Sequence, residues 1–172
     1  MVDASAMAQV AEVLEARKEV PKFVVLSAMG GATDDLLNAG EAARRGDATW
    51  HTLVAELRSR HLEACNSLLE GAAADAVAAE IEDGLAYVRS ICEGLQLLHE
   101  FSDHAKDALV SMGERLSIPI VHALLESKGF QSARLSALKI VVTDSEFGSA
   151  TVDRSHMSEN LRTAMSDLGG CQ

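Results

Sequence analysis

The feature that most constrains the fold is the stretch FVVLSAMGGATDDLL at residues 23–37. Its opening residues are apolar and rich in valine, a pattern typical of a short buried strand over 23–26. Ser27 and the Gly30-Gly31 pair then predict a turn, because glycine adopts backbone conformations that other residues disfavour. Helical spacing of apolar residues begins after Thr33. The stretch therefore predicts a strand, a glycine turn and a helix in direct succession.

The start of that helix has the features of an anion site. Thr33 is the predicted N-cap, because its hydroxyl can accept a hydrogen bond from a first-turn N–H. Asp34 and Asp35 place negative charge at the positive end of the helix dipole. In open α/β sheets, ligands bind at such a junction of strand end and helix N-terminus. The alternative is a tight turn that binds nothing, and the stretch matches neither a P-loop nor a dinucleotide fingerprint.

Apolar residues at helical spacing predict further helices. They cover residues 2–17, 33–45, 49–70 and 74–99, and two shorter segments within 102–128. Asp3 is the expected first N-cap, and Pro21 separates that helix from the strand at 23–26. The split within 102–128 is expected near Gly113, because Gly113 and Pro119 disfavour interior helical positions. Charged outer positions are expected to form a solvated face; they include Glu56, Arg60, Glu82 and Arg89.

The predicted split places Glu114 in the first turn of a new helix, facing the interior. Two interpretations of Glu114 stay open from the residues alone: a carboxylate that complements the helix dipole, or a ligand-binding group. Gly129 is expected to end that helix. Beyond it, the pattern predicts strands at 131–135 and 139–143, a loop at 144–150, and a last helix that starts at Asp153 or Ser155.

Composition excludes several classes of protein. The 172 residues carry a formal net charge of −11, which argues against nucleic acid or an anionic membrane as a partner, because both need clustered Lys and Arg. No apolar run approaches the ~20 residues that span a bilayer, and no signal-peptide pattern is present. The three cysteines are odd in number and widely spaced, so we expect buried, reduced thiols.

Metal ligation by histidine is disfavoured, because zinc needs three or four converging ligands. The four histidines considered lie near helix ends or on a helix face; they are His51, His61, His99 and His104. We therefore predict no metal site and no catalytic residue within the chain.

Three blocks of the sequence resemble, in the same order, conserved blocks of the aspartokinases, which belong to the amino-acid kinase superfamily. The first is VVLSAM at 24–29, with Thr33-Asp34 shortly after it. The second, VSMGERLS at 110–117, is similar to the family's Ser-Phe-Gly-Glu-Arg-Leu-Ser. The third, VVTDSEFGSA at 141–150, is similar to Val-Thr-Asp-x-x-Phe-x-x-Ala. The long helical insert between the first two blocks resembles the monofunctional plant and bacterial enzymes.

The resemblance implies an enzyme that transfers the γ-phosphoryl group of ATP, with Mg²⁺, to the side-chain carboxylate of L-aspartate. The product, 4-phospho-L-aspartate, feeds lysine, threonine and methionine synthesis. Matching motifs place Ser27 and Thr33 against the substrate carboxylates and Glu114 against its ammonium. Gly30 and Gly31 would form a phosphate- or nucleotide-facing loop that the ligand can approach closely. The resemblance also implies a homo-oligomeric full-length enzyme, in the cytoplasm or in the plastid stroma of a photosynthetic eukaryote.

Two cationic motifs of that family have no counterpart here. Lys-Phe-Gly-Gly-Thr-Ser, whose lysine contacts the transferred phosphates, would precede residue 1. Leu-Gly-Arg-Gly-Gly-Ser-Asp, whose arginine binds a substrate carboxylate, would follow residue 172, as would the nucleotide-binding half and the regulatory ACT domains. We therefore expect residues 1–172 to form a partial amino-acid kinase domain of the α/β class. It would be the substrate-side half of a three-layer αβα fold with a long helical insert, inactive on its own.

Two other functions stay open. One is a non-catalytic, helix-rich interaction module derived from a kinase lobe. The other is an amino-acid kinase for glutamate, acetylglutamate or a nucleotide, which the Ser-x-Gly-Glu block and the long insert disfavour. Coding sequence on either side would discriminate between them: the two cationic motifs would support the enzyme, and stop codons would support the module.

Overall fold

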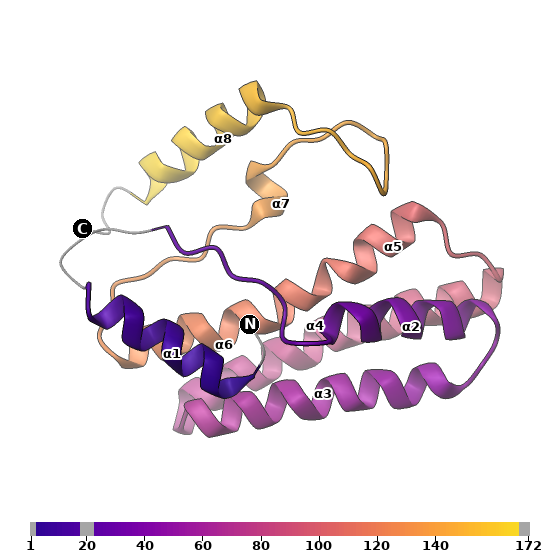
Figure 1. Ribbon diagram of the computed structural model, residues 1–172, viewed down its shortest axis with the longest axis horizontal. Helices are drawn as coiled ribbons and strands as arrows, with labels where there is room; N and C mark the ends of the chain where they lie inside the picture. Colours follow the sequence, from indigo (N-terminus) through magenta and orange to yellow (C-terminus); the bar gives the residue numbers. More distant parts are fainter. Residues whose placement is uncertain (1–2, 18–22, 169–172) are drawn as a thin grey trace.

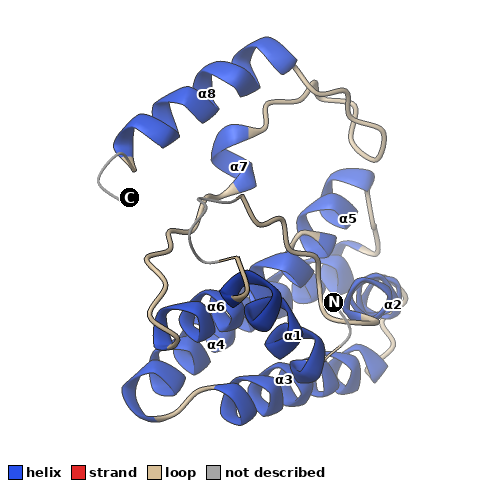
Figure 2. Cartoon of the chain, turned by 60° about the vertical axis from the view of Figure 1, so that its left-hand side comes forward, coloured by secondary structure: helices blue, strands red, loops and turns tan. Residues whose placement is uncertain are grey.

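The computed structural model describes residues 3–17 and 23–168, and within them it contains eight helices and no β-strand (Figures 1 and 2). The helices are α1 (Ala4–Glu15), α2 (Ala32–Arg44), α3 (Thr49–Leu68), α4 (Gly71–Leu98), α5 (Asp103–Val110), α6 (Met112–Ser127), α7 (Ala137–Ile140) and α8 (Arg154–Asp167). All the predicted helices are present, with ends that differ from the predicted ones by a few residues. Pro21 lies outside the described residues.

Side-chain caps explain several of these helix ends. Asp3 Oδ1 accepts a hydrogen bond from the Ala6 N–H at 3.0 Å, which confirms Asp3 as the first N-cap. Asp153 caps α8 in the same way, through the N–H groups of Ser155 and His156. Gly129, at φ +80°, follows α6 and donates its N–H to the Glu126 carbonyl at 2.9 Å. Local capping chemistry therefore sets these ends where the sequence predicts them.

The predicted strands are absent from the described residues, so only the helix-rich part of the α/β prediction is confirmed there. Residues 23–29 and 131–136 form neither a helix nor a strand, and they have no ladder partner. Residues 137–140 form α7 instead of the start of a strand, and a single antiparallel bridge joins Thr143 to Val152. A strand is stable only when its N–H and C=O groups find a neighbouring strand. The described chain offers these segments none.

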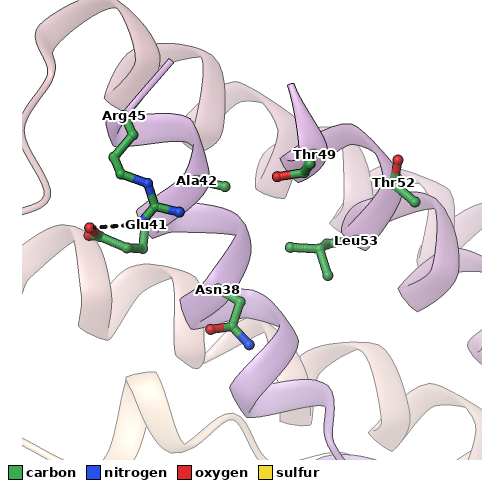
Figure 3. A pocket seen from close by; sticks show the side chains of 7 residues that line it. All are labelled: Asn38, Glu41, Ala42, Arg45, Thr49, Thr52 and Leu53. Carbon is green, nitrogen blue, oxygen red and sulfur yellow. Dashed lines mark hydrogen bonds and ion pairs between the residues drawn. The ribbon is translucent and has the colours of Figure 1, made fainter. Parts of the chain in front are cut away.

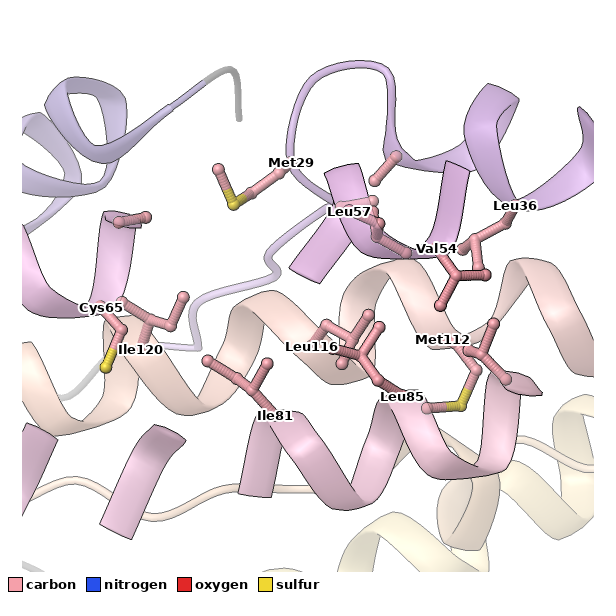
Figure 4. Packing of buried hydrophobic residues seen from close by; sticks show 14 of the residues in the cluster. Met29, Leu36, Val54, Leu57, Cys65, Ile81, Leu85, Met112, Leu116 and Ile120 are labelled. Atoms are coloured by element: carbon pink, nitrogen blue, oxygen red, sulfur yellow. The ribbon is translucent and has the colours of Figure 1, made fainter. Parts of the chain in front are cut away.

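The core lies among α2, α3, α4 and α6, with α1 packed against α3 and α6. Figure 4 shows the centre of this core, where Met112, Leu116 and Ile120 of α6 lie beside Ile81 and Leu85 of α4. Small residues let the helices approach closely. A methyl group at Gly84 would lie 2.9 Å from the Leu116 side chain, and one at Gly40 would lie 2.4 Å from the Phe101 ring.

The cysteines Cys65 and Cys92 are fully buried in this core and unbridged, as predicted. Burial raises the pKa of the Cys92 thiol to about 11, so the thiolate is suppressed at neutral pH. Cys171 lies outside the described residues.

Residues Asp103–Ser127 are long and apolar enough to cross a membrane by length and composition alone. Their most apolar window is 61% buried inside the protein, as expected for core helices of a folded domain. Ser111 also divides the stretch into α5 and α6, which confirms the predicted break beside Gly113.

The helices α7 and α8 lie to one side of the bundle in both views (Figures 1 and 2). They pack against each other, and none of their side chains is buried. The connecting loop contacts α5, where the Gly148 N–H donates to Asp107 Oδ2 at 2.9 Å and the Phe147 ring packs on His104. This part of the chain therefore has little core of its own.

Candidate functional site

The predicted site begins at the turn that leads into α2. Gly31 is the N-cap, at φ +76°, and α2 starts at Ala32. The prediction that Thr33 caps the helix is wrong, because Thr33 is the second helical residue, two positions after the N-cap. The positive φ explains the difference, because glycine adopts it freely and a β-branched residue does not.

The start of α6 lies directly against this turn. Glu114 Oε1 accepts a hydrogen bond from the Ala28 N–H at 3.3 Å, and Ser117 Oγ donates to the Ser27 carbonyl at 3.2 Å. Ser117 is fully buried. The predicted interior orientation of Glu114 is therefore confirmed, and two motifs more than 80 residues apart meet at one place.

Close packing also brings Thr33 to this place. A methyl group added at Gly113 would lie 2.8 Å from the Ala28 side chain and 3.9 Å from Thr33 Oγ1. Only a residue without a side chain allows α6 to start this close to the turn. The Thr33 hydroxyl and the first turn of α6 consequently line the same space.

Free hydrogen-bonding groups face this junction. Within the described residues, the backbone N–H groups of Thr33 and Asp34 and the hydroxyls of Ser27 and Thr33 have no hydrogen-bond partner. Ser27 is exposed, and Glu114 and Thr33 are half-buried. The structure thus brings together Ser27, Thr33 and Glu114, with unpaired N–H groups at the positive end of α2.

Sequence reasoning missed one residue of this region, Arg60 of α3. The prediction that it lies on a solvated face is wrong, because its Nη1 donates to the Gly30 carbonyl at 3.0 Å and its Nη2 pairs with the Asp35 carboxylate. Its Nε is buried without a partner. Helical spacing cannot reveal such a contact, because the turn that crosses Arg60 lies 30 residues away in sequence.

A separate groove of about 460 Å³ lies between α2 and α3 (Figure 3). Its lining consists of Asn38, Glu41, Ala42, Arg45, Thr49, Thr52 and Leu53. The two charged residues that line it pair with each other, Arg45 Nη1 to Glu41 Oε1 at 3.1 Å. None of the predicted site residues lines this groove, and we assign it no ligand.

Possible metal-binding side chains are scattered over the described residues. Among them, no three His, Cys, Asp or Glu side chains come close enough together to hold a metal ion. His51, His61, His99 and His104 do not gather into a site. We assign no metal ligands among the described residues.

Comparisons with known proteins bear on the whole chain. The amino acid kinase family model matches residues 1–169. The chain is 30% identical to aspartokinase 3 (chloroplastic) of Arabidopsis thaliana over 156 residues, which are 88% of this chain and 27% of that protein. It is also 30% identical to an aspartokinase of Chlamydia muridarum, over 87% of this chain and 30% of that protein.

Among solved structures, E. coli aspartokinase III in complex with lysine and aspartate matches with a TM-score of 0.85 at 24% identity. That match covers 97% of this chain and 36% of the E. coli chain. The chain therefore spans about a third or less of the length of these relatives. Because the family match extends over almost all of its residues, the chain belongs to the amino acid kinase family, with a domain of the aspartokinase type.

Proposed function

We propose that residues 1–172 form the aspartate-binding part of an aspartate kinase. One observation carries the proposal: Thr33 and Glu114, far apart in sequence, meet at the N-terminus of α2, where backbone N–H groups are unpaired. A binding site for an amino acid needs an anionic group for the ammonium and hydrogen-bond donors for the carboxylates. This junction supplies both.

Each group has a distinct part in the proposed site. Glu114 Oε1 already accepts the Ala28 N–H, and the second carboxylate oxygen is left to accept the substrate ammonium. The hydroxyls of Ser27 and Thr33, with the Thr33 and Asp34 N–H groups, would donate to the substrate carboxylates. The positive end of the α2 dipole favours those negative charges. Gly31, at φ +76°, lets the chain turn directly into the helix whose first N–H groups these are.

The chemistry of the complete enzyme would be transfer of the γ-phosphoryl group of ATP to the aspartate side-chain carboxylate. Bringing two anions together needs positive charge. Arg60, the cation that lies at the turn, is paired with Asp35, so the described residues add no net positive charge there. We therefore propose that this chain is a partial kinase domain that holds and orients aspartate, and that ATP and Mg²⁺ bind elsewhere in a complete enzyme.

A second candidate function is a non-catalytic interaction module. The observation that favours it is the absence of buried side chains on α7 and α8, which leaves apolar residues such as Leu138 exposed. Exposed apolar surface of this kind is typical of a segment that docks onto another surface. The module would share the fold but would not need Thr33 and Glu114 to lie at the same junction.

Thermal unfolding of the 172-residue chain with increasing L-aspartate tests the proposal. With a dissociation constant on the order of 10 mM, 100 mM aspartate should stabilise the chain by roughly 1.4 kcal/mol. Sodium chloride at equal ionic strength is the control. A saturable rise in the melting temperature with aspartate, but not with sodium chloride, supports the aspartate site. Equal effects of the two additions on the melting temperature would favour the interaction module.

A further inference from the structure

We propose that Arg60 is a positioning residue for the aspartate site, which it serves by holding the glycine turn from the side of α3. The inference rests on the proposed function, because it concerns the same turn that presents Thr33. Arg60 Nη1 donates to the Gly30 carbonyl at 3.0 Å, and Nη2 pairs with Asp35 in the first turn of α2. One guanidinium thus bridges the residue before the N-cap and the fourth residue after it.

The placement of the guanidinium is specific to this turn. A methyl group at Gly31 would lie 3.4 Å from Arg60 Nη1, so the guanidinium also lies against the N-cap residue. The Arg60 Nε is buried without a partner, which costs free energy that a freely rotating surface arginine would avoid. Its two outer nitrogens are therefore held by the turn. A planar guanidinium suits this double contact because its two outer nitrogens are held apart in a rigid fork, whereas the three donors of a lysine ammonium share one nitrogen.

The pairing with Asp35 has a second consequence for an anionic substrate. Asp35 places a negative charge within the first turn of α2, where the substrate carboxylates would bind. Unpaired, that charge would repel the substrate. Arg60 neutralises it and also donates to the Gly30 carbonyl, which accepts from neither the Thr33 nor the Asp34 N–H. The position of the glycine turn and the net charge at the first turn of α2 thus both depend on Arg60.

Arg58 offers a matched comparison on the same helix. It pairs with Glu82 of α4 at 2.5 Å, with 49% of its side chain exposed against 36% for Arg60. Its hydrogen bond and its ion pair go to Glu82, not to the glycine turn or the first turn of α2. Arg58→Gln therefore removes one arginine and one ion pair without touching the proposed site.

The experiment uses the 172-residue chain with Arg60→Gln, Arg60→Lys and Arg58→Gln. Hydrogen–deuterium exchange by mass spectrometry follows a peptide that contains the Ala32 and Asp35 amides, which are bonded to the Met29 and Gly31 carbonyls. Thermal-shift titration gives the affinity for L-aspartate. In Arg60→Gln, we expect exchange of this peptide and the aspartate dissociation constant each to rise by about tenfold. Arg60→Lys should fall between Arg60→Gln and the unmodified chain, and Arg58→Gln should match the unmodified chain.

The two proposals fail in different ways. If exchange and affinity in Arg60→Gln equal those in Arg58→Gln, the positioning role of Arg60 is wrong. If the unmodified chain shows no saturable response to aspartate, the aspartate site is wrong, and exchange of the turn alone then decides whether Arg60 holds it. Faster exchange throughout the protein in Arg60→Gln would also overturn the inference, because it would show a general loss of stability.

Discussion

The Glu114 carboxylate accepts a hydrogen bond from the backbone N–H of Ala28 at 3.3 Å, across 86 positions of sequence. This bond joins the start of α6 to the turn before α2. It means that Glu114 has a structural partner before any ligand arrives. A test of its binding role must therefore keep that bond and remove only the charge.

The contact between Gly113 and Ala28 should be intolerant of a side chain. Gly113→Ala places a methyl group 2.8 Å from the Ala28 side chain, so α6 or the turn has to move. We expect a loss of about 1–3 kcal/mol in the free energy of unfolding, measured by urea denaturation.

Gly94→Ala is the control, because nothing lies within 4 Å of the added methyl group at this position near the C-terminal end of α4. It should stabilise the chain by roughly 0.5–1 kcal/mol. A Gly113→Ala variant that is as stable as the unmodified chain would show that the turn and α6 are not in close contact.

His61 should make stability depend on pH in a mildly acidic window. Burial lowers the pKa of His61 below its ordinary 6.5, partly opposed by the hydrogen bond between Nδ1 and the Leu57 carbonyl and reinforced by the charge of Arg60. Below pH 6.5 the unfolded chain binds a proton at His61 that the folded chain does not. The contribution of His61 to the free energy of unfolding is therefore fully present above pH 6.5. It is lost as the pH falls, by at most ~1.4 kcal/mol per pH unit.

Urea denaturation between pH 6.5 and ~5, above the range in which most carboxylates protonate, measures this effect. His61→Gln should flatten the slope. His156→Gln is a useful control, since the hydrogen bond from His156 to Asp153 raises the pKa of His156 and its contribution has the opposite sign. A slope that His61→Gln leaves unchanged would contradict the assignment.

The unpaired segment at residues 23–25 should promote self-association. Val25 is 95% exposed and Phe23 is 66% exposed, in a stretch with strand-forming composition. We expect the mass from light scattering to exceed that of a monomer and to rise with concentration. Val25→Lys should lower it, whereas Val13→Lys, at an exposed valine of α1, should not. A monomer at every concentration would contradict this expectation.

The chain alone should not phosphorylate aspartate. The cation at the turn, Arg60, is already paired with Asp35, so the described residues add no net positive charge where two anions would have to meet. Incubation with ATP, Mg²⁺, aspartate and hydroxylamine should therefore yield no aspartyl hydroxamate above the blank. Hydroxamate that depends on both ATP and aspartate would show that residues 1–172 contain a complete catalytic site.

Local chemistry explains what the sequence predicts well. Several helix ends are fixed by contacts with residues only a few positions away, as at Asp3, Asp153 and Gly129. Such ends can be predicted because the residues that make the contact are neighbours in the sequence. The break before Gly113 and the inward orientation of Glu114 follow in the same way. The N-cap is the exception: Thr33 has a suitable side chain, but the chain adopts φ +76° at Gly31 and the helix begins directly after it.

Distant contacts explain what the sequence does not reveal. Residues 23–26 have strand composition, but a strand also needs a partner that composition does not report. Arg60 has the spacing of a solvent-facing residue on α3, and no local pattern shows that the turn at Gly30 passes over it. The partner of Glu114 likewise depends on how α6 packs against a turn far away in sequence.

The most direct test of the aspartate site compares L-aspartate with succinate, which has both carboxylates but no ammonium, on the unmodified chain and on Glu114→Gln. The glutamine keeps an oxygen for the Ala28 N–H and removes the charge. A charge-assisted hydrogen bond contributes roughly 1.5–3 kcal/mol, so the unmodified chain should prefer aspartate by about 10- to 150-fold, and Glu114→Gln should bind both ligands alike. An equal preference for aspartate in both proteins would contradict the assignment of Glu114 to the substrate ammonium.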